Sequence, residues 1–122
     1  MTENLTESQY EGLYNSWILT TWLVKRGLTS IDDVRQRGDW RSEGFSVWPR
    51  ACTDAEGRPA VRVRWCGDDP ARGLRSVANR LTQLGVPWEW QEGKDPPHMP
   101  NIPVLLVPIM DDMREEAEQA TA

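Results

Sequence analysis

AVRVRWCGDDPARGLRSVANRLTQLGVPWEWQ, residues 60–91, is the stretch that decides the fold, because it reads as a strand, a helix and a second strand. Apolar and polar residues alternate from Val61 to Cys66, and a period of two marks a strand with one apolar face. Asp69 can accept hydrogen bonds from the first amides of a helix, and Pro70 suits the first helical turn because it needs no donor there.

The predicted helix carries one apolar stripe and ends at Gly85. Its apolar residues recur at three- and four-residue spacing: Leu74, Val77, Ala78, Leu81 and Leu84. We expect Gly85 to close the helix in the left-handed conformation. Alternation resumes over residues 86–91 and predicts the second strand. If the two strands run parallel in one sheet, their crossover should be right-handed.

Residues 60–66 also form the second arm of a predicted hairpin, with residues 45–52 as the first arm and a turn between them. Alternation favours a register that pairs Ala51 with Val63 and Pro49 with Trp65. One face is then apolar, with Phe45, Val47, Val61, Val63 and Trp65. The other face carries Trp48, Arg50, Arg62 and Arg64. Pro49 places the first arm at a sheet edge.

The chain begins with a predicted helix, capped by Thr6 or Ser8 and ended by Gly27, and a short second helix follows over residues 31–37. The first helix is apolar on two sides. One side carries Tyr10, Leu13, Tyr14, Trp17, Ile18 and Val24. The other carries Leu19, Trp22 and Leu23. Such a helix is either covered on both sides by its own domain or meets a partner with one of them.

The carboxyl-terminal part begins with a Pro-rich loop at residues 92–102, which is followed by a buried strand over Val104–Ile109. Asp111 or Asp112 caps a last helix that ends in a solvated acidic tail. The sequence therefore predicts one α+β domain over residues 1–122, frayed over 1–6 and from about 115 to 122. Its small mixed sheet has three or four strands, a hairpin plus the strand-helix-strand crossover, and packs with the N-terminal helical pair.

Composition limits the function classes. The net charge of −5 argues against a general nucleic-acid binder and against an anionic membrane surface. The chain has no apolar run long enough to span a bilayer and no signal peptide, so we expect a cytoplasmic protein. Cys52 and Cys66 are out of register in the hairpin, which argues against a disulfide. Twelve of the 14 basic residues are Arg, which is typical of GC-rich bacterial or phage genomes.

The sequence contains no recognisable catalytic constellation and implies no cofactor. His98 is the only histidine and lacks the spacing of a metal site. Two aspartate pairs, Asp68–Asp69 and Asp111–Asp112, each follow a predicted strand. Paired carboxylates can bind a divalent metal, but the same residues are also expected helix caps.

Three functional hypotheses follow. The first is a small acidic, non-enzymatic interaction protein, an adaptor, inhibitor or accessory protein of phage or mobile-element origin, that binds a partner or itself through Leu19, Trp22 and Leu23. The second is a nucleic-acid or nucleotide-binding module that uses Trp48, Arg50, Arg62 and Arg64, unless the first helix covers them or acidic side chains neutralise them. The third is a metal-dependent enzyme that uses the paired aspartates.

Overall fold

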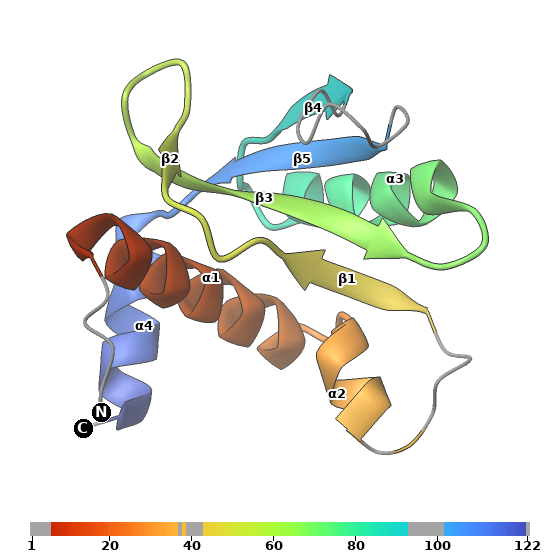
Figure 1. The fold of residues 1–122 in the computed structure, drawn as a ribbon, viewed down its shortest axis with the longest axis horizontal. Coiled ribbons are helices and arrows are strands. Elements are labelled where there is room, and N and C mark those ends of the chain that lie inside the picture. The colour runs from red at the N-terminus through yellow and green to blue at the C-terminus, as the bar shows by residue number, and fades with distance from the viewer. Residues whose placement is uncertain (1–5, 37, 39–42, 93–101, 122) are drawn as a thin grey trace.

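The computed structural model describes residues 6–36, 38, 43–92 and 102–121. Their order along the chain is two helices, three strands, a helix, two strands and a helix (Figure 1). The elements are α1 (Glu7–Lys25), α2 (Ile31–Gln36), β1 (Gly44–Val47), β2 (Cys52–Thr53), β3 (Pro59–Cys66), α3 (Pro70–Gln83), β4 (Glu89–Glu92), β5 (Pro103–Pro108) and α4 (Asp111–Thr121). The α+β class is confirmed, and most of the predicted loop at residues 92–102 lies outside the described residues.

The strands form one sheet in the order β1-β3-β5-β4, and β2 pairs with β3 beyond the end of β1. Every pairing is antiparallel. β3 and β4 do point the same way, as the strand-helix-strand pattern suggested, but β5 lies between them and pairs with both. The expected mixed sheet is therefore replaced by an antiparallel one, because the strand that follows β4 inserts into the gap left by the crossover.

The residues predicted to cap the helices do so at three helix ends. Thr6 and Gln9 form a reciprocal capping box at the start of α1. The Asp69 carboxylate accepts a hydrogen bond from the Arg72 amide at the start of α3, with Pro70 in the first turn. Gly85, just after α3, has a φ of 77°, which a residue with a β-carbon rarely adopts. These contacts fix where α1 and α3 begin and where α3 ends.

The hairpin keeps its predicted faces but not its predicted register. Val47 pairs with Val63 and Phe45 with Trp65, so the first arm is displaced by four residues from the expected alignment. An even displacement leaves each side chain on the same face. The arm is also broken after Val47, and pairing resumes at Cys52 opposite Ala60. Pro49, which cannot donate to a strand ladder, lies within this break.

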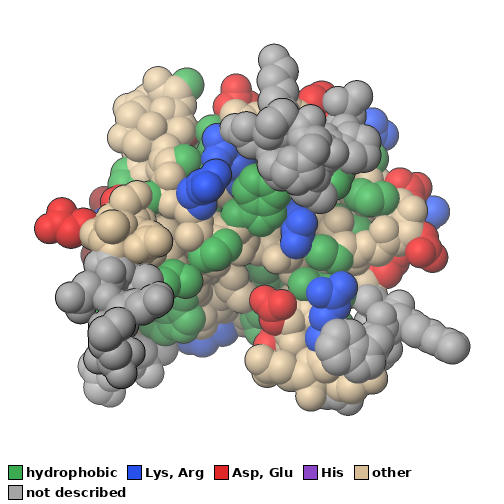
Figure 2. Space-filling view, viewed as in Figure 1, with side chains coloured by type: hydrophobic (Ala, Val, Ile, Leu, Met, Phe, Trp, Pro, Cys, Tyr) green, Lys and Arg blue, Asp and Glu red, His purple; other side chains and the backbone are tan. Residues whose placement is uncertain are grey.

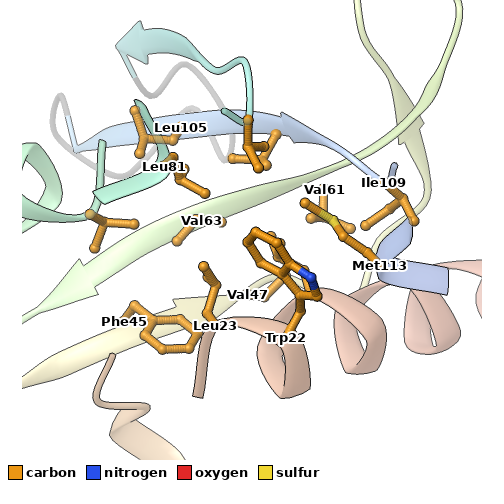
Figure 3. Close-up of a cluster of buried hydrophobic side chains, with 14 of the residues drawn as sticks. Trp22, Leu23, Phe45, Val47, Val61, Val63, Leu81, Leu105, Ile109 and Met113 are labelled. Atoms are coloured by element: carbon orange, nitrogen blue, oxygen red, sulfur yellow. The ribbon is translucent and has the colours of Figure 1, made fainter. Parts of the chain in front are cut away.

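One hydrophobic core lies on the side of the sheet that α3 covers (Figure 3). Trp22 and Leu23 point from α1 toward Val61 and Val63, and Met113 of α4 enters the same group. Met113 is fully buried and Ala117 nearly so. The last helix therefore runs to Thr121 and docks on the core, where a solvated tail was expected. No helix within the described ranges is long and apolar enough to cross a membrane.

The outer edge of β1 is covered by the helical part of the chain. The Phe45 amide donates to the Thr29 carbonyl oxygen at 2.9 Å, and Ser30 forms an isolated parallel bridge with Phe45. Farther along, the Ser16 hydroxyl donates to the Val47 carbonyl oxygen at 3.2 Å. These bonds satisfy backbone groups that an edge strand would otherwise present to other chains.

Candidate functional site

The residues predicted as an interface on α1 are core residues. Leu19 and Leu23 are fully buried and Trp22 is 4% exposed, so the prediction that they form a surface is wrong. The physical reason lies in their neighbours on the same side of α1. Gly12 and Asn15 are also buried there, and their small size lets the helix approach the rest of the domain closely. An ideal β-carbon on Gly12 would lie 2.6 Å from the Pro49 carbonyl oxygen.

Trp22 also lies beneath the guanidinium of Arg26, which forms an ion pair with α4. The Arg26 guanidinium lies 3.8 Å from the centre of the Trp22 ring. The same group donates to both carboxylate oxygens of Glu116, at 2.9 and 3.0 Å. Hydrogen bonds from Arg26 hold the pKa of Glu116 below its ordinary value, and burial opposes that shift only in part. The bidentate Arg26–Glu116 pair over the Trp22 ring therefore stabilises the packing of α4 against the core.

The exposed side of α1 is the opposite one, here called the outer face of α1: Tyr10, Leu13, Tyr14, Trp17 and Val24. Their exposed fractions run from 37% to 60%. Tyr14 and Trp17 stack with ring centres 5.9 Å apart. The Tyr14 hydroxyl donates to Glu118 of α4 at 3.1 Å, and burial together with this bond raises the Tyr14 pKa. Five of the six large apolar side chains that are exposed in the described part of the chain lie on this face.

The second candidate surface is the sheet face turned away from the core, here called the Arg/Trp face: Trp48, Arg62 and Arg64. The Trp48 amide donates to the Arg62 carbonyl oxygen at 2.9 Å, so the two residues are directly opposite across β1 and β3. The Arg64 guanidinium lies 5.9 Å from the centre of the Trp48 ring. In Figure 2, basic and hydrophobic side chains share the centre of this view, and most acidic ones lie toward the rim.

The structure brings three of the four predicted residues of this face together. Arg50 is different, because it lies in the break between β1 and β2 and is exposed, with its Cα against Gly12 of α1. The first helix does not cover the face, since its buried side chains share the core with Val61 and Val63 on the other side. Glu89, an acidic residue on the same face, forms no ion pair with Arg62 or Arg64.

Cys52 lies at one end of the Arg/Trp face and Cys66 at the other. Strand pairing places Cys52 opposite Ala60, six residues along β3 from Cys66, which is about 20 Å. Both cysteines are reduced. The Cys52 thiol donates to the Ala60 carbonyl oxygen at 3.1 Å. Burial raises the pKa of this thiol, and the positive charge of Arg62 offsets the shift only in part, so Cys52 is a poor nucleophile at neutral pH.

The aspartate pairs do not meet. Asp68 and Asp69 follow the carboxyl end of β3, and Asp111 and Asp112 follow that of β5. Because β3 and β5 are antiparallel, their carboxyl ends lie at opposite ends of the sheet, a strand length apart. Across the described residues, no three His, Cys, Asp or Glu side chains gather into a possible metal site. His98 falls outside those residues.

Two of the hollows in the described surface are poor anion sites, because the Arg side chain of one is ion-paired and the charged side chains that line the other are mainly carboxylates. One, of about 210 Å³, lies beside Leu106 and Trp88, and its Arg58 is paired with Asp54 and Glu56. Desolvation alone would raise the Asp54 pKa, but hydrogen bonds from Arg58 and Glu56 outweigh it and lower the pKa. The other hollow, of about 480 Å³, is lined by Glu43, Trp65 and the Asp68–Asp69 cap of α3. Neither hollow offers a metal ligand set, and in the second hollow Arg72 is outnumbered by three carboxylates.

Comparisons with protein-family models, with curated proteins and with solved structures return no match for this chain. Function is therefore argued from the two surfaces themselves. Strand alternation correctly placed Trp48, Arg62 and Arg64 on one sheet face, and their role in binding stays a prediction, whereas the side of α1 predicted as an interface is buried. The small residues Gly12 and Asn15, on the same side as Leu19 and Trp22, are the sequence feature that distinguishes the buried side from the exposed one.

Proposed function

We propose that this chain is a small, non-enzymatic interaction protein that self-associates through the outer face of α1. The observation that carries the proposal is the concentration of exposed aromatic and aliphatic side chains along one helix. Aromatic residues are enriched at the centres of protein interfaces, whereas soluble monomers expose few contiguous apolar patches. An adaptor, inhibitor or accessory role in the cytoplasm, with a phage or mobile-element origin, is part of this proposal.

We propose that the partner bound at the outer face of α1 is a second copy of the chain, with the two α1 helices antiparallel. The outer face runs from Tyr10 to Val24, and its middle residue is Trp17. A two-fold axis at Trp17 would place Tyr10 of one copy beside Val24 of the other, over a contact length of about 21 Å. The surface maps onto itself under this operation, as an isologous interface requires.

Charge also favours the antiparallel arrangement. The amino-terminal half of the outer face is bordered by Glu7, Glu11 and, from α4, Glu118, whereas Lys25 borders its other end. An antiparallel pair places each acidic half beside the partner's Lys25 and keeps the two acidic halves apart. A parallel pair would bring like charges together, and that would cost binding free energy.

The test is the concentration dependence of mass in solution, measured by light scattering and sedimentation velocity. We expect a dimer at high concentration and a dissociation constant at least about tenfold weaker in Trp17→Ala, because an aromatic residue at the centre of an interface contributes most. Trp88→Ala is the matched control, since Trp88 is 38% exposed and Trp17 39%. A wild type that stays monomeric at several hundred micromolar, or equal losses in both variants, would refute the proposal.

A further inference from the structure

The Arg/Trp face holds two guanidinium groups that have no counter-ion among the described residues. Arg62 and Arg64 lie two residues apart on β3, so their Cα atoms are about 6.6 Å apart and their side chains leave the same face. Neither forms an ion pair or a hydrogen bond to a side chain in the parts of the chain that are described. By contrast, the half-buried Arg26 and Arg58 are each paired with carboxylates.

Arg64 is also held in place before any ligand arrives. Its guanidinium lies over the Trp48 ring, and its Nε is buried without a hydrogen-bond acceptor among the described residues. A buried donor without an acceptor costs free energy, more so when it belongs to a charged group. Because the Nε has almost no accessible surface, an outside acceptor would meet the terminal nitrogens of the guanidinium, and the contact with Trp48 limits the side-chain entropy lost on binding.

The half-exposed Trp48 ring favours a ligand with a flat aromatic part as well as a charge. Arg62 pairs across the strands with Leu106 of β5, and strand alternation puts Val104 on the same face, but both side chains are only 4% exposed and offer a ligand little surface. The nearest acidic strand residue on this face is Glu89, which pairs with the far side of Leu106, two strands or about 10 Å from Arg62. The face thus presents two guanidinium groups beside the ring of Trp48.

We propose that the Arg/Trp face binds a nucleotide that carries at least two phosphates, with the phosphates on Arg62 and Arg64 and the base against Trp48. Arg forks match phosphate oxygens in bidentate geometry, and aromatic side chains stack on bases. A mononucleotide fits better than a nucleic-acid strand, because a chain with a net charge of −5 repels a long polyanion. This site is on a different face from the outer face of α1, so it can exist with or without self-association.

The experiment is calorimetric titration of the wild type at low salt with ADP, pyrophosphate, adenosine and a short oligothymidylate. We expect ADP to bind, pyrophosphate to bind more weakly, and adenosine to bind more weakly still. Arg62→Gln should weaken ADP binding about tenfold or more, as expected for a lost charge-assisted hydrogen bond. Arg64→Lys should also weaken it, because an ammonium group keeps the charge but loses the planar fork.

The matched control is Arg75→Gln on α3. The Arg75 guanidinium lies 5.9 Å from the centre of the Trp90 ring, the same distance as in the Arg64–Trp48 pair, but on the opposite side of the sheet. It should leave ADP affinity within about twofold of the wild type. Circular dichroism checks that each variant folds. The inference fails if ADP does not bind, if Arg75→Gln matches Arg62→Gln, or if the oligothymidylate binds more tightly than ADP.

Discussion

Gly12→Ala tests the close packing of α1 against the break in the hairpin. An ideal β-carbon at this position would lie 2.6 Å from the Pro49 carbonyl oxygen, 2.7 Å from the Ala51 amide nitrogen and 2.9 Å from the Arg50 Cα. Ordinary carbon contacts lie at about 3.5–4.0 Å, so the helix and this segment must separate by roughly 1 Å. All three obstructing atoms belong to the backbone, and no side-chain rotation can relieve them.

Two opposing terms set the size of the effect. Overpacking of this kind costs about 1–3 kcal/mol, whereas replacing Gly by Ala inside a helix gains about 1 kcal/mol. Because the obstruction is backbone, we expect the overpacking cost to lie in the upper part of its range, at about 2–3 kcal/mol, which leaves a net loss of about 1–2 kcal/mol in the free energy of unfolding. With a urea m-value of about 2 kcal/mol/M, the midpoint should fall by about 0.5–1 M.

The assay is equilibrium urea unfolding followed by far-ultraviolet circular dichroism. Glu11→Ala is the control, because Glu11 is the exposed neighbour of Gly12 on the same helix and its replacement should change the free energy of unfolding by no more than about 0.5 kcal/mol. A Gly12→Ala protein that is as stable as the wild type, or more stable, would show that α1 does not pack on residues 49–51 as described.

Two further predictions concern α4. Met113→Ala should lower the free energy of unfolding by about 2–4 kcal/mol in urea titrations, because Met113 is fully buried; a change below 0.5 kcal/mol would mean that α4 is not docked. The Glu116 pKa is lowered in the folded state by Arg26, so the stability it contributes is present above its ordinary value of 4.5 and is lost as pH falls below it. Glu116→Gln should therefore flatten the acid limb of a stability-versus-pH curve, and an unchanged limb would contradict the role of the pair.

Much of the fold could be predicted because local and long-range preferences agree in residues 60–91. The Asp69–Pro70 start and the Gly85 end fix α3, and alternation fixes which residues of β3 face it. Register was harder, because any even displacement preserves the faces. Pro49 disrupts the first arm, and no local pattern says how many residues the break consumes.

The remaining differences arise from contacts between distant segments. The apolar content of α1 is divided between two sides, and only packing against residues 49–51 and α4 decides which side is buried. Likewise, α4 offers only Met113 and Ala117 to the core, and its docking depends on Arg26 reaching Glu116 from a helix 90 residues earlier. The Arg/Trp face was predictable because it needs nothing beyond strand alternation, whereas Arg50 was misplaced by the break.

The position of β5 has a consequence for how the chain folds during synthesis. β3 and β4 do not pair with each other, and each pairs with β5, which leaves the ribosome after both of them. Until residues 103–108 emerge, the sheet lacks the strand between β3 and β4, and α3 can pack on only part of the sheet. The central pairings of the sheet therefore join segments far apart in the sequence, and contacts of high sequence separation slow folding. The nascent chain should stay protease-sensitive until β5 closes the gap.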